Sequence, residues 1–596
     1  MPQKHQIFQQ NRAFPLNPAQ KSAAEAPTSP LLIVAGAGTG KTKTLTSRIV
    51  HLIENGIPAA KICAITFTNK AAKEMQGRVK HTGPLICTFH SLGARILRKE
   101  CRLLGRGANF AIFDDHDSFG LIKKIVKGSL TEKSKKLTPA FFAQKIAEIK
   151  NLNAARESRM ESPEEKALIL SVFKKYEEAL LRNNAFDFDD LIQKPVAIFG
   201  NHPAVLKKYQ SLFDAILVDE YQDINPKQYE LVKFLSSEHK NLSVVGDDEQ
   251  TIYSWRYANI KTFLNFDKDW PGAKIYFLEE NYRSTENIIR AAGAVAENNR
   301  YRTPKKLWTK NPEGERIALY EAWGENDEAE WIAGEIKKTG TKNRRSEIAI
   351  LYRTNAQSRA IEQALIRHDI PYEIFGGLKF YERREVKDVV AGLRWASNNK
   401  DEVARERLEK NLSKRDFATF RGRIAAAEDL RPTDIIKVFL EIFGYFDYLE
   451  EHFLNAGERE ENIGELITFA GEFKGLSELL EKISLLQTTD GIGESDEEKI
   501  NLMTIHMGKG LEFERVFIAG AAEGLLPHIR SIDNEDSLEE ERRLMYVAMT
   551  RAKEKLHISF YGMPSRFIGE IPEGCMKLIE AEPAEGEEEE EIISLD

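Results

Sequence analysis

Short apolar runs alternate with amphipathic segments over the first hundred residues of the chain. Residues 30–36 (PLLIVAG) and 62–67 (ICAITF) are apolar runs of the length of a buried strand. Between them, residues 41–54 place four apolar side chains on one face of a helix. Strands that alternate with helices in this way predict a parallel sheet that is covered by helices on both faces.

The same strand pattern returns further along the chain. Apolar runs predict strands at residues 214–220, 242–248, 274–281, 316–323, 347–353, 500–506, 515–520 and 555–561. Two long stretches between them, which include Lys-rich amphipathic segments, contain few strand signals. The pattern therefore predicts an α/β protein with two parallel-sheet bodies, each interrupted by a mainly helical insertion.

These changes of pattern also predict the domain boundaries. The first body is expected to comprise residues 1–105 and 189–276, around a helical insertion at 106–188. The second is expected to comprise residues 277–379 and 497–579, around an insertion at 380–496 that ends in an exposed linker (488–499). Residues 580–596 are Glu-rich and are expected to form a disordered acidic tail.

The composition is ordinary for a globular protein, but the charge is unevenly distributed. Of the 596 residues, 42% are hydrophobic and 30% are charged. The tail contains nine acidic residues and no Lys or Arg, so it accounts for the net charge of −8. The nearly neutral remainder neither supports nor excludes a nucleic-acid partner, and the tail is a candidate handle for a protein partner.

Targeting and redox signals are absent from the sequence. The chain has no apolar run of membrane-spanning length, and its N-terminal segment lacks the apolar stretch of a secretory leader. The four cysteines lie far apart and form no CxxC pair, which argues against a disulfide framework or a zinc site. We therefore expect a cytoplasmic protein without membrane association.

A glycine-rich loop after the first predicted strand carries the strongest chemical signal. The loop reads AGAGTGKT and comprises Ala35, Gly36, Ala37, Gly38, Thr39, Gly40, Lys41 and Thr42. Its short side chains allow backbone N–H groups to wrap a phosphate at a helix N-terminus, although Ala35 replaces the usual first glycine. Lys41 is expected to reach the β- and γ-phosphates and Thr42 to ligate Mg²⁺. The alternative is a glycine-rich turn before an unrelated helix, which the order of strand, loop and helix disfavours.

A pair of carboxylates follows a later predicted strand. The string ILVDEYQD (216–223) places Asp219 and Glu220 directly after an apolar run. Alone, such a pair is more often a solvated turn. Together with the glycine-rich loop it predicts an ATPase site, in which Asp219 holds Mg²⁺ and Glu220 polarises the attacking water.

Further strings occur in a fixed order along the chain. They are LNPAQ (16–20), ITFTNKAAKEM (65–75), TFHSLGARILR (88–98), VVGDDEQTIYSWRYA (244–258), FLEENYRST (277–285), LYRTNAQSRAIEQAL (351–365), MTIHMGKGLEF (503–513) and EERRLMYVAMTRAKEKL (540–556). This set, spanning about residues 15–565, resembles the motifs of the superfamily 1 helicases of the UvrD/Rep/PcrA type. The resemblance implies two RecA-like motor domains that close around one ATP and move along single-stranded DNA.

The resemblance also implies roles for individual residues around ATP. The adenine and ribose side is assigned to Gln20, Tyr282 and Glu512. Gln250 would sense the γ-phosphate, and Arg283 and Arg551 would reach that phosphate with a guanidinium group. Without the resemblance, Arg551 would be read as an ordinary charged residue at a helix end.

A DNA-binding face is implied in the same way. Phe67, Phe188, Tyr253 and Trp255 would stack on bases, and His90, Arg256, Arg359 and His506 would meet the backbone or the bases. From the sequence alone, Phe188 is more readily explained as a core residue, and His506 could be structural. Trp255 follows a polar turn and lies close to Tyr253 and Arg256, so it is harder to explain as core.

The expected function is ATP-dependent 3′–5′ translocation on single-stranded DNA and unwinding at single-strand/duplex junctions, in DNA repair or replication restart. The second insertion is shorter than is usual in the family, which leaves as an alternative a DNA-stimulated ATPase that displaces proteins from DNA and unwinds weakly. A regulatory ATP-binding module without a DNA role is the other alternative. The aromatic residues of 244–258 argue against it.

Overall fold

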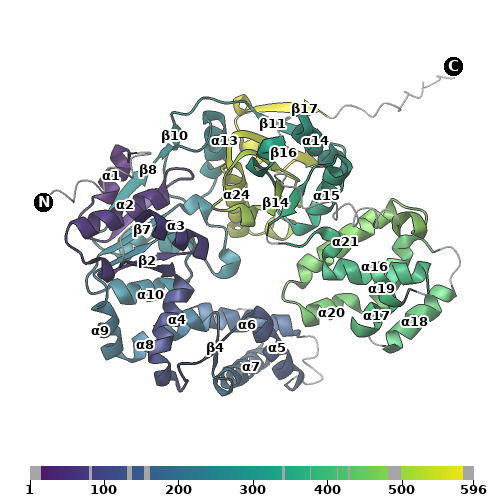
Figure 1. Ribbon diagram of the computed structural model, residues 1–596, viewed down its shortest axis with the longest axis horizontal. Coiled ribbons are helices and arrows are strands. Elements are labelled where there is room, and N and C mark those ends of the chain that lie inside the picture. Colours follow the sequence, from purple (N-terminus) through teal and green to yellow (C-terminus); the bar gives the residue numbers. More distant parts are fainter. Residues whose placement is uncertain are drawn as a thin grey trace. The chain divides into compact units, whose positions relative to one another are not determined.

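The computed structural model describes residues 15–79, 83–129, 137–152, 162–338, 342–375, 377–399, 401–411, 414–426, 430–480, 483 and 499–580. The chain forms two compact units, each built on a parallel sheet (Figure 1). The first unit comprises Met1–Arg283, Asn299–Lys310 and Asn398–Glu461, and the second comprises Ser284–Asn298, Asn311–Ser397 and Asn462–Asp596. This confirms the predicted fold class.

The sheet of the first unit has six parallel strands in the order β3-β2-β6-β7-β1-β8. Their bounds are β1 (Leu31–Ala35), β2 (Ile62–Thr66), β3 (Leu85–Thr88), β6 (Ala215–Val218), β7 (Leu242–Gly246) and β8 (Lys274–Leu278). Side chains alternate between two cores, so that Leu31 and Ile33 face one and Leu32 and Val34 face the other.

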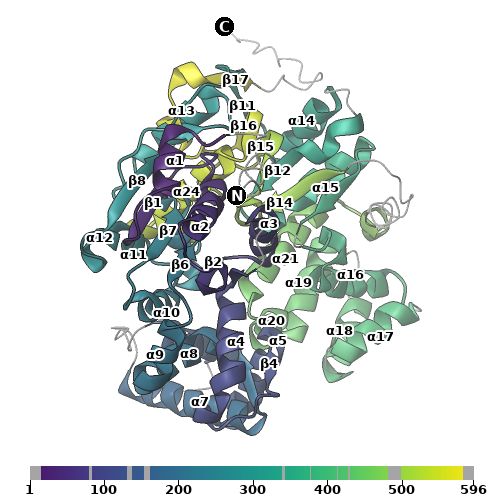
Figure 2. The same cartoon turned by 60° about the vertical axis from the view of Figure 1, so that its left-hand side comes forward.

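Helices cover both faces of this sheet. The first core is shared with α1 (Pro18–Ala24), α2 (Lys41–Glu54) and α3 (Asn69–Val79). The second is shared with α4 (Phe89–Glu100), α8 (Asp190–Asn201), α9 (Pro203–Gln210), α10 (Pro226–Ser236), α11 (Ile260–Leu264) and α12 (Phe266–Asp269). In both Figure 1 and Figure 2, α4, α8, α9 and α10 gather on one side of the sheet.

The residues between α4 and α8 form a helical subdomain with a core of its own. Its elements are β4 (Ala111–Phe113), α5 (Asp115–Lys127), α6 (Pro139–Asn151), α7 (Pro163–Arg182) and β5 (Ala185–Asp187). Proline stands at the first position of α6 and α7, and the side chains of Thr138 and Ser162 cap these helices. The predicted helical stretch at 106–188 therefore also contains a short parallel strand pair, β4 and β5.

The second unit contains a seven-stranded parallel sheet with the order β13-β14-β12-β15-β16-β11-β17. The strands are β11 (Ile317–Ala322), β12 (Ile348–Tyr352), β13 (Tyr372–Ile374), β14 (Ile500–Thr504), β15 (Phe513–Ile518), β16 (Ala552–Tyr561) and β17 (Met576–Glu580). Helices α14 (Glu325–Lys338) and α15 (Ser358–Arg367) share a core with it, and α13 (Glu286–Glu297) packs on α24 (Glu535–Met549).

Further helices lie in the stretch predicted as the second insertion. They are α16 (Arg384–Ser397), α17 (Glu402–Asn411), α18 (Lys414–Ala425), α19 (Pro432–Phe443), α20 (Tyr445–His452) and α21 (Ala456–Gly471). Residues Asn398–Glu461 group with the first unit, whereas the sequence pattern assigned the whole stretch to the second body. The predicted linker at 488–499 lies outside the described residues except for its last position.

The division between the units also differs from the predicted boundary at 276/277. Strand β8 continues to Leu278 and pairs with β1, so the first unit extends to Arg283. At the other end, Glu580 closes β17, while the rest of the predicted acidic tail lies outside the described residues. Across the described part of the chain, no helix is long and apolar enough to span a membrane. All four cysteines are buried and form no disulfide.

Gly93 provides a test of the packing beneath the first sheet. A Cβ at this position would lie 1.7 Å from the carbonyl oxygen of Leu191, which places the backbones of α4 and α8 in direct contact. Helix propensity alone favours alanine over glycine by about 1 kcal/mol. We expect Gly93→Ala to destabilise the protein by about 1–3 kcal/mol, because neither backbone can move away cheaply. Thermal unfolding measures the change.

Gly77 is the matched control for this substitution. It lies in α3 of the same unit, and a Cβ there would meet nothing within 4 Å. Gly77→Ala is expected to leave the melting temperature unchanged or to raise it. Equal melting temperatures for the two variants would show that α4 and α8 tolerate a wider separation than the structure has.

Candidate functional site

The loop that joins β1 to α2 depends on glycine at three positions. Gly38 and Gly40 have φ values of +69° and +83°, in the left-handed region that favours glycine. A Cβ at Gly38 would lie 2.5 Å from Nδ2 of Asn281, and a Cβ at Gly36 would lie 2.3 Å from Cδ2 of Leu307. The loop is therefore tightly wound and closely covered, and it delivers the chain to the N-terminus of α2, where helix N–H groups favour a phosphate.

Polar contacts hold this loop from within. The Thr39 hydroxyl donates to the Gly36 carbonyl at 2.8 Å, and Nδ2 of Asn281 donates to the Ala37 carbonyl at 2.7 Å. The Lys41 ammonium lies 3.4 Å from the carbonyls of both Ala35 and Gly36, which are long contacts for a charged donor. An ammonium group above a glycine-rich loop is suited to bind the terminal phosphates of a nucleotide.

Asp219 follows β6 and faces the start of α2. Its Oδ2 accepts a hydrogen bond from the Thr42 hydroxyl at 3.3 Å. Burial and the neighbouring Glu220 raise the pKa of Asp219 to about 7, although Lys41 opposes the shift. Carboxylate and hydroxyl oxygens are ligands that suit Mg²⁺, and a divalent cation would supply positive charge to this buried carboxylate. The residues present thus fit a magnesium site.

Glu220 is held in an unusual conformation. Its φ is +50°, in the left-handed region, which costs a non-glycine residue about 1–3 kcal/mol and is concentrated at functional sites. The Gln222 side chain donates to the Glu220 carboxylate, and Oε1 of Gln222 accepts the backbone N–H of Asp247 at 3.1 Å. The end of β6 is thereby connected to the end of β7, its neighbour in the sheet.

Gln250 extends this line of hydrogen bonds. Its Nε2 donates to Oδ2 of Asp247 at 2.7 Å, and both side chains are buried. Contacts therefore run from Glu220 through Gln222 and Asp247 to Gln250. The predicted water-activating carboxylate and the predicted γ-phosphate sensor belong to one network.

The residues predicted to read adenine lie beside the same loop. Nε2 of Gln20 donates to the Thr39 carbonyl at 2.8 Å, and the backbone N–H of Tyr282 donates to the Gly38 carbonyl at 3.0 Å. The Tyr282 ring is half exposed. Its hydroxyl accepts from Nδ2 of Asn17 at 2.8 Å and donates to the Glu280 carboxylate at 2.7 Å. This anchoring places Arg283, the next residue, at the edge of the phosphate loop.

The predicted DNA-stacking residues of the first unit lie in two aromatic groups, one of three rings and one of two. The rings of Phe67 and Tyr253 stack with centroids 5.4 Å apart, and Trp255 meets Tyr253 at 6.1 Å. His90 contacts Phe188 edge-on at 5.9 Å. Trp255 and Phe188 are among the exposed large hydrophobic side chains, which excludes a core position for both.

Arg256 interacts with a ring from each of these two groups, Trp255 and His90. Its guanidinium lies 4.6 Å from the Trp255 ring centroid, within cation–π range. Burial and the positive charge of Arg256 lower the pKa of His90, so this imidazole is neutral near pH 7. Exposed rings flanked by a guanidinium form a surface suited to unstacked bases and their phosphates.

Trp255 carries the largest exposed ring of this surface, and its removal should weaken DNA binding directly. Stacking of a base on an aromatic side chain is worth about 1–3 kcal/mol. Trp255→Ala is therefore expected to weaken binding of a single-stranded oligonucleotide by about 5–150-fold. Fluorescence anisotropy measures this affinity, and ATP turnover without DNA should stay within about threefold of the parent.

Trp255→Phe is the matched variant, because it keeps an aromatic face on the same backbone. It should recover most of the lost affinity. Equal weakening by phenylalanine and alanine would show that the indole acts through packing and not through base stacking.

The other predicted site residues belong to the second unit. The Arg551 side chain is buried and donates to the carbonyls of Val547 at 2.9 Å and Leu511 at 3.1 Å. These bonds hold the guanidinium at the end of α24. Glu512 pairs with Lys553, with 3.2 Å between carboxylate oxygen and ammonium nitrogen. The roles of Arg551 and Glu512 toward ATP stay predictions.

Arg359 and His506 differ from the simple expectation of exposed DNA contacts. Arg359 is fully buried, and it pairs with the carboxylates of Glu325 and Glu465. Burial, reinforced by Arg353, lowers the pKa of His506 to about 3, so its imidazole is uncharged. DNA contact by Arg359 and His506 stays a prediction, and Arg359 would have to exchange its ion pairs to make it.

Several residues of this site were not singled out from the sequence. Asn17, Gln222 and Asn281 lie inside the quoted strings but were assigned no role, and Lys305 lies outside all of them. Their importance comes from partners 25 to 263 residues away in the chain. Spacing along the sequence does not reveal such pairs.

The fold and this site define a P-loop nucleoside triphosphatase with two parallel-sheet units. The model of the UvrD/REP helicase N-terminal domain matches residues 16–271, and that of the UvrD-like helicase C-terminal domain matches residues 276–438 and 436–562. The ATP-dependent DNA helicases PcrA of Staphylococcus epidermidis and of Staphylococcus aureus are each 40% identical to this chain, over 94% of it and 87% of their own length. The chain belongs to the UvrD/Rep family of helicases.

Proposed function

We propose that this protein is an ATP-dependent DNA helicase that moves 3′ to 5′ on single-stranded DNA and opens duplex at single-strand/duplex junctions. We further propose that it acts in the cytoplasm, in DNA repair or replication restart. Family membership and the printed names of the PcrA relatives support the activity. The remaining support comes from the geometry of the first unit.

One observation carries the proposal. The segment that follows β7 contributes Asp247 and Gln250 to the hydrogen-bond network of the phosphate loop, and it contributes Tyr253 and Trp255 to the aromatic surface. Gln250 and Tyr253 are three residues apart, so a displacement of Gln250 has only a short length of chain to cross before it reaches the DNA face. This is the physical connection that a DNA-driven ATPase requires.

In this proposal, the chain's own residues divide the chemistry of ATP cleavage. The phosphate loop and Lys41 bind the terminal phosphates, and Glu220 takes up the proton of the attacking water. Thr42 and Asp219 would hold Mg²⁺, which neutralises charge on the β- and γ-phosphates when bound. Gln20 and Tyr282 would hold the adenine, and Glu512 would contact the ribose.

The arginines serve the transition state of this reaction. Arg283 and Arg551 would place guanidinium groups on the transferring phosphoryl group, whose oxygens carry the charge. Such arginines are worth about 10³–10⁵ in rate in other NTPases. The DNA contacts in this proposal come from other segments, with Phe67, Phe188, Tyr253 and Trp255 stacking on bases and His90, Arg256, Arg359 and His506 meeting bases or phosphates.

The test compares ATP turnover with and without single-stranded DNA and then measures strand displacement. We expect turnover to rise with single-stranded DNA, and displacement to require a 3′ tail on the duplex. An ATP turnover rate that is the same with and without single-stranded DNA would indicate a nucleotide-binding module without a DNA role, and it would contradict the proposal. Displacement from a 5′ tail instead would overturn the polarity.

A second function in the same fold is displacement of proteins from DNA with weak unwinding. The short second insertion, with α16 to α21 in its described part, favours it, because less helical surface is available to contact the duplex. Strong DNA-stimulated turnover with removal of a bound protein, and no displacement of a 3′-tailed strand, would identify this function.

A further inference from the structure

Residues 299–310, which we name the strap, pack in the first unit although the chain on both sides of them belongs to the second. The strap ends in β10 (Trp308–Thr309), which pairs in parallel with β9 (Glu280–Asn281). Leu307 covers Gly36 of the phosphate loop so closely that a Cβ there would overlap it. The strap therefore forms one wall of the nucleotide site.

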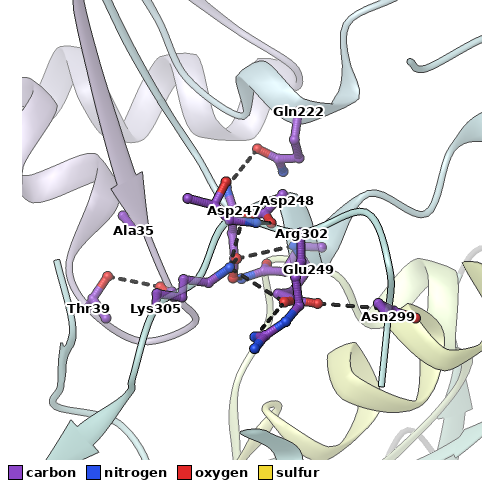
Figure 3. Close-up of polar contacts among 12 residues, drawn as sticks. Ala35, Thr39, Gln222, Asp247, Asp248, Glu249, Asn299, Arg302 and Lys305 are labelled. Atoms are coloured by element: carbon purple, nitrogen blue, oxygen red, sulfur yellow. Dashed lines mark hydrogen bonds and ion pairs between the residues drawn. The ribbon is translucent and has the colours of Figure 1, made fainter. Parts of the chain in front are cut away.

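Lys305 reaches from the strap into a group of three buried carboxylates (Figure 3). Its ammonium lies 2.8 Å from Asp248, 3.0 Å from Asp247 and 3.8 Å from Glu249, and its side chain is 4% exposed. The backbone N–H of Thr303 also donates to Asp248. The strap thus holds the 247–249 segment through a charged side chain and a backbone group.

Lys305 is the main positive charge that balances the buried carboxylates of this cluster. Burial alone would lower the pKa of Lys305, but Asp247, Asp248 and Glu249 outweigh it and raise that pKa. Burial likewise acts against the charge of Asp247, yet Lys305 and then Lys41 lower the pKa of that carboxyl. Arg302 lies 3.8 Å from Glu249 and is more exposed. Without Lys305, Asp247 and Asp248 lose their closest cation.

Asp247 connects this cluster with the line of hydrogen bonds that runs from Glu220 to Gln250. One of its carboxylate oxygens contacts Lys305, and the other accepts the Gln250 amide. Its backbone N–H donates to Gln222, which donates to Glu220. A carboxylate that has lost its cation would turn toward water or take a proton, and in either case the Gln250 amide loses its fixed acceptor.

We propose that Lys305 is a positioning residue for ATP turnover, which holds Asp247 so that Gln250 keeps the orientation needed at the γ-phosphate. This inference rests on the proposed role of Gln250. It assigns to the strap a function that the helicase motifs do not contain, since the strap lies between the strings at 277–285 and 351–365.

The test is a double-substitution cycle with Lys305→Met and Gln250→Ala in the full chain. Each single variant should lower DNA-stimulated kcat by about 10-fold or more, with KM for ATP and DNA affinity within about threefold of the parent. The double variant should be no slower than Gln250→Ala, because Lys305 acts through that residue. Lys305→Arg keeps the charge and should recover most of the turnover.

Lys150 provides the matched control for a merely structural cost. Its ammonium is buried among Glu177, Asp187 and Asp190, so Lys150→Met also removes a buried lysine from three carboxylates. Those carboxylates belong to α7, β5 and α8. Lys194 still pairs with Glu177 and Asp190, as Arg302 still pairs with Glu249 in the Lys305 cluster. Lys150→Met should lower the melting temperature. In the double variant with Gln250→Ala, any fold-loss in kcat that Lys150→Met causes should multiply the fold-loss of Gln250→Ala, because the two residues act independently.

Two results would overturn the proposal. One is a double variant, Lys305→Met with Gln250→Ala, whose fold-loss in kcat equals the product of the two single fold-losses. The other is an equal loss from Lys305→Arg and Lys305→Met at an unchanged melting temperature, because charge would then not matter. If the parent protein is not stimulated by DNA, the proposed function fails, and the same cycle read on basal kcat still decides the role of Lys305.

Discussion

Glu220→Gln is expected to bind ATP with nearly unchanged affinity and to hydrolyse it about 10²–10⁴-fold more slowly, which is the usual contribution of a general base. The substitution keeps the size of the side chain and removes its negative charge, and with it the ability to take a proton from water. The phosphate loop and Lys41 are untouched, so the groups that bind the triphosphate remain. DNA-stimulated turnover and equilibrium binding of a fluorescent ATP analogue measure the two quantities separately.

Asp214→Asn is the matched control for this prediction. Asp214 directly precedes β6, whereas Glu220 follows it, so the two carboxylates mark opposite ends of one strand. Asp214 is half exposed and pairs with Lys61 at 3.1 Å, and such surface pairs contribute little. Its amide variant should turn over ATP within about threefold of the parent. A Glu220→Gln protein that does the same would exclude Glu220 as the water-activating group.

The strands of the two sheets were predictable where both faces of the sheet are covered. Central strands such as β1, β6 and β12 are nearly continuous apolar runs, because helices pack on both of their sides. Edge strands carry a weaker signal. β3, β13 and β17 were missed, and each lies at an edge of its sheet, where a strand is short or only partly buried.

The site was predictable where local geometry requires particular residues. The phosphate loop needs glycine at positions 38 and 40 for its backbone, so the string itself predicts a phosphate-binding loop. Lys305 shows nothing of this kind. In the string RTPKKLWT it looks like an exposed charge, and only the fold brings it to Asp247, 58 residues earlier in the chain.

Partners that are distant in sequence also explain why the buried, ion-paired state of Arg359 was not predicted. The motif places an arginine at a helix start, but the fold supplies its partners, because Glu325 begins α14 and Glu465 lies in α21. Burial and pairing depend on the packing of segments that are distant in sequence. A residue type in a motif therefore predicts a chemical capacity, whereas the state of that residue in the folded chain is set by its neighbours.

Lys41→Ala is expected to impair both binding and cleavage of ATP, in contrast to Glu220→Gln. Loss of a charge that pairs with a phosphate in a partly buried site costs about 2–5 kcal/mol, which corresponds to about 30–5,000-fold in affinity or rate. The Lys41 ammonium lies 3.4 Å from the carbonyls of Ala35 and Gly36, and its charge also lowers the pKa of the buried carboxyls of Asp219 and Asp247. Thermal unfolding therefore separates any structural cost of the substitution from the loss of phosphate binding. Nucleotide-analogue binding, turnover and thermal unfolding measure the three quantities.

Lys43→Ala separates the position of the charge from its mere presence on α2. Lys43 stands two residues further along the helix, where its ammonium donates to the Pro15 carbonyl at 3.3 Å. Both variants lose one positive charge from the same helix, so any long-range effect on the triphosphate is shared. Only Lys41→Ala should lose ATP binding. Equal losses in the two variants would mean that the general field of α2, and not a direct contact from Lys41, holds the phosphates.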